Sequence, residues 1–257
     1  MIIDTHTHID NEAYFNDLDS VIKEACNDGV SKMIIPGADI NDLARAKEIT
    51  QNYENVYMSV GMHPYHHDQY NEKIFQEYAN NDKCVALGEC GLDYFRLPEN
   101  IDEKHKEKES QKQVFINQIK LASKYEKPLI VHIREANEDS LNILKKHHSS
   151  SKGGVLHCFN ASESLLDLSD YGFYFGIGGV LTFKNAKKLV EVLPKIPLDK
   201  LVIETDAPYL TPHPHRGSRN EPKYTRLVVQ KVAEILNKSE QEIEEITTAN
   251  ANELFFS

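Results

Sequence analysis

The chain opens with Ile2-Ile3-Asp4-Thr5-His6-Thr7-His8, an apolar start followed by alternating polar side chains. In an extended strand, successive side chains point to opposite faces, so Asp4, His6 and His8 would share one face. Two imidazoles placed that close together could hold a metal ion. A His-x-His pair by itself is equally typical of ordinary core or surface histidines, so the rest of the chain must decide between these interpretations.

Eight short stretches rich in β-forming residues recur along the chain, and helical patterns separate them. This alternation is typical of a parallel sheet with crossover helices. Eight such units in 257 residues predict an α/β fold, a single (β/α)8 barrel domain spanning residues 1–257. The expected strands are residues 1–8, 31–37, 56–63, 84–91, 128–134, 154–159, 174–179 and 201–206.

Helical patterns cover residues 19–27, 43–52, 107–124, 139–146 and 186–193, and two more helices, 222–236 and 240–254, end the chain. Ser239 and Glu242 form a capping-box pattern at the start of the second. We expect these extra C-terminal helices to brace the outside of the barrel. The alternative architecture is an open doubly wound sheet, but no Gly-rich phosphate loop follows any of the expected strands.

Composition restricts the possible partners of the chain. A formal net charge of -11 argues against a broad basic surface that grips duplex nucleic acid, although a phosphate substrate held locally by bound cations stays possible. The sequence contains no apolar run long enough for a membrane helix and no signal-peptide pattern, so we expect a cytoplasmic protein without membrane contact. Its four scattered cysteines are expected to be free thiols. Strand alternation predicts that Cys90 and Cys158 point away from any metal site.

Four more expected strands carry a potential ligand near their carboxyl ends: Glu89, His132, His157 and Asp206. In a (β/α)8 barrel all those ends meet at one face, where active sites lie. Buried carboxylates need a partner or a metal. Together with His6 and His8, these residues provide more ligands than one cation with an open position requires, so we expect two divalent cations bridged by Glu89. The sequence does not choose among Zn, Mg, Mn, Fe, Co and Ni.

The candidate ligands stand in sequence blocks that follow one another in a fixed order. The blocks are Thr5-His6-Thr7-His8, Gly61-Met62-His63-Pro64, Gly88-Glu89-Cys90-Gly91-Leu92-Asp93-Tyr94, Val131-His132-Ile133-Arg134, Leu156-His157-Cys158-Phe159, Glu204-Thr205-Asp206-Ala207-Pro208-Tyr209-Leu210 and Arg216-Gly217-Ser218-Arg219-Asn220-Glu221-Pro222. Together they resemble the TatD-type deoxyribonucleases over essentially the whole chain. The resemblance implies an amidohydrolase-like barrel and a metal-dependent DNA exonuclease. It also implies that His6, His8, Glu89 and Asp206 surround one metal, and that Glu89, His132 and His157 surround the other.

Other side chains near these ligands are candidates for binding substrate or orienting ligands. Asp4 and Glu204 share strand parity with His6 and Asp206, so we expect them to orient ligand imidazoles. His66, in the polar segment after Pro64, is expected to be a solvated loop residue. Candidate substrate-binding residues are His63, Arg134, Arg216 and Arg219 for phosphate oxygens, and Tyr94, together with Phe95 and Tyr209, for stacking on a base.

The expected reaction is hydrolysis of a DNA phosphodiester by a hydroxide that bridges the two cations, with Asp206 and Glu89 as catalytic residues. The substrate would be a single-stranded or frayed 3′ end, cleaved in the 3′-5′ direction, and the sequence indicates no obligate protein partner. The alternative is hydrolysis of a small amide, lactone or other non-nucleic-acid substrate, because the same hydroxide attacks carbonyl carbon. A metal-bound scaffold without catalysis is a third interpretation.

Overall fold

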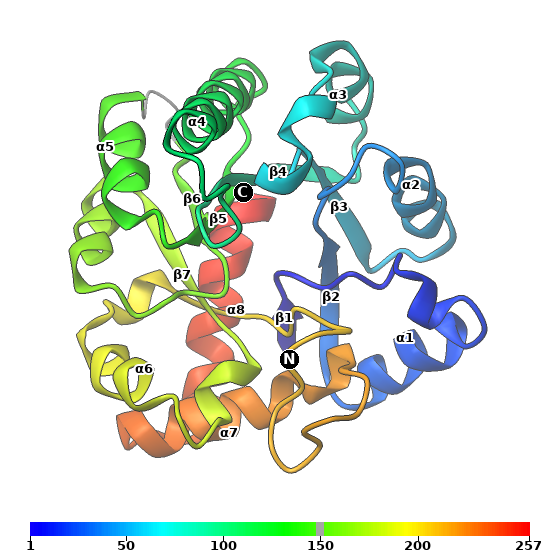
Figure 1. Cartoon of the computed structure of the whole chain (residues 1–257). Helices are drawn as coiled ribbons and strands as arrows, with labels where there is room; N and C mark the ends of the chain where they lie inside the picture. Colours follow the sequence, from blue (N-terminus) through cyan, green and yellow to red (C-terminus); the bar gives the residue numbers. More distant parts are fainter. Residues whose placement is uncertain (148–151) are drawn as a thin grey trace.

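The computed structural model of the chain describes residues 1–147 and 152–257, in which eight parallel strands form one sheet in sequence order. Backbone hydrogen bonds from Thr5 to Ile203 and from His8 to Ala207 close β8 onto β1. Helices ring the closed sheet (Figure 1), which confirms the expected (β/α)8 barrel. The strands are β1 Ile2–Asp4, β2 Val30–Ile35, β3 Val56–Val60, β4 Cys84–Asp93, β5 Leu129–Arg134, β6 Gly154–Leu156, β7 Phe173–Ile177 and β8 Leu201–Ile203.

The helices follow the sequence patterns with three differences. The short helix α3 was not predicted, a 3-10 segment η3 (Glu163–Tyr171) joins β6 to β7, and α4 begins at Ile101 because the Asn100 side chain caps the first turn. None of the described helices is both long and apolar enough to cross a membrane. The helices are α1 Leu18–Asn27, α2 Leu43–Asn52, α3 Glu72–Ala79, α4 Ile101–Lys124, α5 Asn137–His147, α6 Lys187–Val192, α7 Thr225–Leu236 and α8 Glu240–Phe256.

Helix α8 corrects one expectation. Its capping box of Ser239 and Glu242 is present, but the helix does not lie on the outside of the barrel. Ala251, Leu254 and Phe255 pack into the same apolar cluster as the inward-facing strand residues, such as Ile3, and α8 runs behind the barrel centre in Figure 1. The helix therefore closes the end of the barrel where the strands begin, because that apolar interior would otherwise face water.

Several strands end earlier than the sequence pattern predicted. β1 stops at Asp4, β6 at Leu156 and β8 at Ile203, so the polar residues that follow lie on loops rather than on strands. These loops still leave the barrel at its carboxyl-terminal face, where the strand ends converge. The polar loop residues that follow these strands therefore lie together at one end of the barrel, opposite the end that α8 closes.

Candidate metal centre

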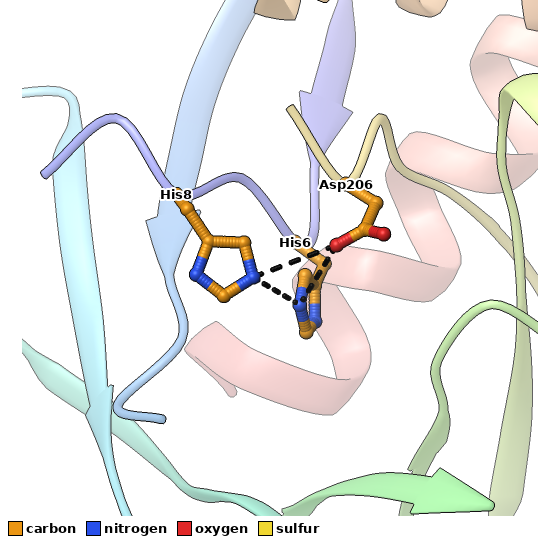
Figure 2. Close-up of side chains that lie close together, drawn as sticks. All are labelled: His6, His8 and Asp206. Carbon is orange, nitrogen blue, oxygen red and sulfur yellow. Dashed lines mark hydrogen bonds and ion pairs between the residues drawn. The ribbon is translucent and has the colours of Figure 1, made fainter. Parts of the chain in front are cut away.

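Four side chains from β4 and from the loops after β1 and β8 converge at the barrel mouth. His6 Nε2 lies 3.2 Å from His8 Nε2, 3.4 Å from Glu89 Oε2 and 3.6 Å from Asp206 Oδ1. His8 Nε2 lies 3.9 Å from Glu89 Oε2 and 3.5 Å from Asp206 Oδ1. Figure 2 shows both imidazoles and the Asp206 carboxylate directed at a common point. We call these four residues the first cluster.

The spacing of the first cluster fits a metal ion. A tetrahedral site with metal–ligand bonds of about 2.0–2.1 Å separates neighbouring ligand atoms by about 3.3–3.4 Å. The five separations given above run from 3.2 to 3.9 Å. Two imidazole nitrogens and two carboxylate oxygens are also a donor set typical of Zn or another first-row divalent metal. Geometry and chemistry therefore suit a cation at the centre of this cluster.

A second cluster shares Glu89 with the first through its other carboxylate oxygen. Glu89 Oε1 lies 3.0 Å from His132 Nδ1 and 3.1 Å from His157 Nε2, and the two imidazole nitrogens are 3.3 Å apart. The rings of His157 and His6 stack with their centroids 3.8 Å apart, which joins the two clusters. A carboxylate whose two oxygens face separate groups of imidazoles is placed to bridge two cations.

Carboxylates outside the second cluster lie beside its imidazoles. Asp93 Oδ2 lies 2.9 Å from His132 Nε2 and is placed to accept its proton, which would leave the Nδ1 lone pair available to a cation between His132 and Glu89. Glu204 Oε1 lies 3.7 Å from His157 Nδ1 and accepts a hydrogen bond from the backbone N–H of Cys158. Asp93 was not predicted, although it stands four residues after Glu89 on the same strand.

His63 stands beside the second cluster in a different role. The backbone N–H of Tyr65 donates to His63 Nδ1 at 3.1 Å, and burial lowers the pKa of His63 to about 3. The neutral ring must therefore carry its proton on Nε2, the nitrogen that lies 3.7 Å from Glu89 Oε1. A nitrogen that bears a proton is a hydrogen-bond donor and has no lone pair to offer a metal.

Both carboxylates of the two clusters are held in the ionised form. Burial by itself would raise the pKa of Glu89, but the neighbouring imidazoles of His157 and His6 lower it well below its ordinary value. The pKa of Asp206 is also lowered, because a hydrogen bond with His8 and the nearby imidazoles outweigh burial. Two anionic oxygen ligands are thus available to cations.

The backbone conformation at these ligands sets the direction of their side chains, and sequence periodicity does not reveal it. Gly88 precedes Glu89 with φ 140°, and a Cβ there would lie 2.4 Å from the Ile130 carbonyl oxygen. Asp206 adopts a left-handed φ of 58°, which is uncommon outside glycine. Asn220 Nδ2 donates to the carbonyls of Thr205 and Tyr209, fixing the loop on both sides of Asp206. The strained residue is thus held where its carboxylate meets the cluster.

The buried Asp4 and Glu204 act differently from each other. Asp4 accepts hydrogen bonds from the backbone and hydroxyl of Thr205 and from the backbone N–H of His6, so it fastens β1 and the residue after it to the loop after β8. Glu204 lies beside an imidazole, with Oε1 3.7 Å from His157 Nδ1, whereas Asp4 contacts His6 through the backbone. Gly176 leaves room for Glu204, because a Cβ there would lie 2.2 Å from Glu204 Oε2.

A cavity of about 560 Å³ opens beside both clusters, within the usual size range of small-molecule and cofactor sites. His132, His157 and Asp206 line it on one side, together with Arg134 and Lys188. Most of the remaining wall is apolar and comes from Ile133, Phe159, Ala161, Val180, Ala186, Leu189 and Leu210. A substrate bound here would place a polar group against the clusters and an apolar or aromatic group against the wall.

Three candidate substrate-binding residues are not among those that line the cavity beside the clusters. Tyr94 is buried and its hydroxyl donates to Asp139, so it cannot stack on a base. Arg219 forms ion pairs with Asp17 and Glu221 away from the clusters, and these carboxylates raise its pKa. The guanidinium of Arg216 stacks on Phe183 at 3.8 Å and donates to the Thr211 carbonyl. These side chains already have protein partners, which the sequence pattern could not show.

Other residues reach the cavity instead. Tyr209 is 52% exposed and lines it, with its ring 5.9 Å from that of His8. Phe95 is not a lining residue, but its 50% exposed ring carries the guanidinium of Arg134, which does line the cavity, 3.6 Å from the ring centroid. Cys158 also lines the cavity, because its φ of 44° breaks the strand alternation that predicted a position pointing away from the metal site. Cys90 is buried as expected.

Comparisons with known proteins agree with this architecture. The family described as TatD related DNase matches residues 3–256. An uncharacterized metal-dependent hydrolase of Bacillus subtilis is 42% identical over 261 residues, which cover 99% of both chains. A Salmonella typhimurium protein named 3′-5′ ssDNA/RNA exonuclease TatD is 33% identical over 264 residues, covering 99% of this chain and 98% of the relative. The crystal structure of a TatD homologue from Escherichia coli has a TM-score of 0.91 at 30% identity and covers 100% of this chain and 98% of its own. The chain therefore belongs to the TatD-related DNase family.

Proposed function

We propose that this protein binds two divalent cations and hydrolyses phosphodiester bonds at the end of single-stranded DNA, releasing nucleotides one at a time. The observation that carries the proposal is the pair of clusters that share Glu89 at the edge of the cavity. When bound, the two cations would activate water and neutralise the charge of the phosphate. Two divalent cations facing two carboxylates leave a net positive centre, which attracts a phosphate in an otherwise acidic protein.

Residues of the chain supply the proton transfer and orientation. Asp206 turns Oδ1 toward His6 and His8, and its other oxygen is directed away from both rings (Figure 2). Oδ2 is therefore placed to accept the proton of the attacking water. The Nε2–H of His63 would donate to a phosphoryl oxygen, where negative charge develops. Arg134, held on the Phe95 ring at the cavity, would bind another phosphoryl oxygen.

A single-stranded substrate suits the cavity and its aromatic residues. Tyr209 and Phe95 present exposed rings on which unpaired bases can stack. A net charge of -11 disfavours wrapping of a duplex. The Salmonella typhimurium relative is named a 3′-5′ ssDNA/RNA exonuclease, which supports attack at the 3′ end. The base of the terminal nucleotide would lie against the apolar wall of the cavity.

A second candidate function is hydrolysis of a small amide or lactone. The apolar wall formed by residues such as Ile133, Phe159 and Leu189 favours it, because a neutral substrate could be enclosed there. Arg134 and Lys188 on the same cavity favour the phosphate substrate instead. We rank the phosphodiester first, because a neutral substrate would leave the side chains of Arg134 and Lys188 without an anion to bind.

We expect Glu89→Gln to lower the cation content of the purified protein, because one amide oxygen cannot bridge two cations as a carboxylate does. The measurement is elemental analysis after loading with Mn or Zn and removal of excess metal. We expect about two ions per wild-type chain and at most one in the variant. Glu99→Gln, at an exposed carboxylate ten residues later, should retain both ions. Equal metal content in the three proteins would contradict the bridging role.

We expect His63→Ala to lower kcat by roughly 10²-fold while the cation content stays at the wild-type value, because the residue donates a hydrogen bond and does not ligate metal. Elemental analysis and steady-state kinetics on the same preparations check both parts. His66→Ala, at the neighbouring loop histidine, should change neither quantity. Loss of a cation from His63→Ala would identify His63 as a ligand and overturn its assignment as a donor.

Substrate class is tested by incubating the metal-loaded protein with single-stranded DNA labelled within the strand, and in parallel with a panel of lactones and cyclic amides. We expect stepwise release of mononucleotides from the 3′ end, lost in Glu89→Gln and retained in Glu99→Gln. Turnover of a lactone or amide with DNA left intact across Mg, Mn, Co and Zn would put the second candidate function first.

A further inference from the structure

The charges around the barrel mouth are divided between two sides. Lys184, Lys187 and Lys188 lie on and just before α6, after β7, and all three are exposed. Asp10, Asp39 and Asp42 lie on the loops after β1 and β2. In Figure 1, α6 and α2 stand on opposite sides of the barrel. A polyanion that reaches the metal centre would therefore meet attraction on one side and repulsion on the other.

The basic side is continuous with the cavity. Lys188 and Ala186 line the cavity, and Ala186 also borders a shallow surface pocket lined by Phe183, Lys184 and Lys187. Arg216 lies on the Phe183 ring, which extends the row of cations. We call Lys184, Lys187, Lys188 and Arg216 the basic ridge. It leads from the metal centre outward over α6.

The cations of the basic ridge are not neutralised by the protein. Among the residues that the structure describes, none of the four forms an ion pair, whereas nearby Lys195 pairs with Glu163 and Lys231 with Glu234. Glu191 lines the same surface pocket as Lys184 and Lys187, but no ion pair joins it to them in the described part of the chain. In a chain with net charge -11, such a row of exposed cations has a strong field of its own. Such a row is suited to an anionic polymer whose charges repeat along its length.

The acidic side is concentrated near Tyr209 and His8. Asp39 Oδ2 lies 3.8 Å from His66 Nε2, and the pKa of Asp42 is raised first by burial and then by Asp39. The pKa of Tyr209 is raised by burial and by Asp206, and also by the more distant Asp10 and Asp42. The Arg45 side chain is the nearby cation, and it donates to the Asp10 carbonyl. Carboxylates outnumber cations there.

Resting on the proposed nuclease function, we infer that the strand still attached to the scissile nucleotide leaves the metal centre over the basic ridge, with its phosphates on Lys184, Lys187, Lys188 and Arg216. The basic ridge binds the phosphates of the DNA backbone and does not discriminate between bases. Its contribution grows with strand length, because a dinucleotide ends within the cavity and does not reach Lys184 or Lys187. Substrate length preference is therefore set on α6 and the segment before it, away from the metal ligands.

The test compares Lys184→Gln/Lys187→Gln with Lys120→Gln/Lys124→Gln, a control with the same charge change near the far end of α4. Each metal-loaded protein is titrated with a fluorescent phosphorothioate oligothymidylate of about twelve nucleotides over a range of salt concentrations. Loss of two phosphate contacts should weaken binding roughly ten- to thirtyfold at about 0.1 M salt and reduce the slope of log Kd against log salt by about 1.4. The control should match the wild type.

Kinetics on the corresponding phosphodiester substrates complete the test. The ratio of kcat/KM for the long strand to kcat/KM for the dinucleotide should fall about tenfold in the ridge variant and stay unchanged in the control. Equal salt slopes in the ridge variant and the wild type, or an equal loss in both variants, would overturn the path over α6 while leaving the nuclease function standing. A wild-type protein that neither binds nor cleaves these oligonucleotides would overturn the proposed function and this inference together.

Discussion

The buried carboxylate of Glu89 is the constraint on which the arrangement at the barrel mouth depends. It is 3% exposed, and its two oxygens face imidazoles from β5 and from the loops after β1 and β6 at 3.0–3.4 Å. A buried anion requires compensating positive charge, and several imidazole lone pairs aimed at one place require an electrophile. Divalent cations on both sides of Glu89 satisfy both requirements. Two further carboxylates stand behind the rings that Glu89 faces: Asp93 is hydrogen-bonded to His132, and Glu204 lies 3.7 Å from His157.

The barrel can hold this arrangement because different parts of it stabilise the fold and carry the reacting groups. Its interior is filled with apolar side chains and closed at one end by α8, so the opposite end can carry irregular backbone and buried charge. Asp206 and Cys158 hold positive φ there, and Asn220 secures the loop that carries Asp206. Strain and unpaired polar atoms, including His6 Nδ1, are concentrated at the mouth, as expected where preorganisation serves a reaction.

The sequence could predict the barrel and the convergence of the candidate ligands, because both follow from order and position along the chain. Eight apolar stretches imply eight strand ends, and ends of parallel strands meet whatever their detailed length. Details that depend on tertiary contacts could not be predicted. Periodicity placed Asp206 and Cys158 on strands, but left-handed backbone redirected both. Tyr94 and Arg219 bind Asp139 and Asp17 within the protein. Helix α8 closes one end of the barrel because it covers apolar residues of the interior. Asp93 could have been predicted if the expected fourth strand had been extended past Gly91, because Asp93 then shares a strand face with Glu89.

Anomalous scattering from crystals grown with Mn tests most directly whether Glu89 bridges two cations. A bridging Glu89 predicts two peaks about 3.5–4 Å apart. One would lie among His6, His8 and Asp206, the other between His132 and His157, with the Glu89 carboxylate between the peaks. A single peak, or a peak ligated by His63 and Asp93 in place of Glu89, would contradict the claim that Glu89 bridges two cations.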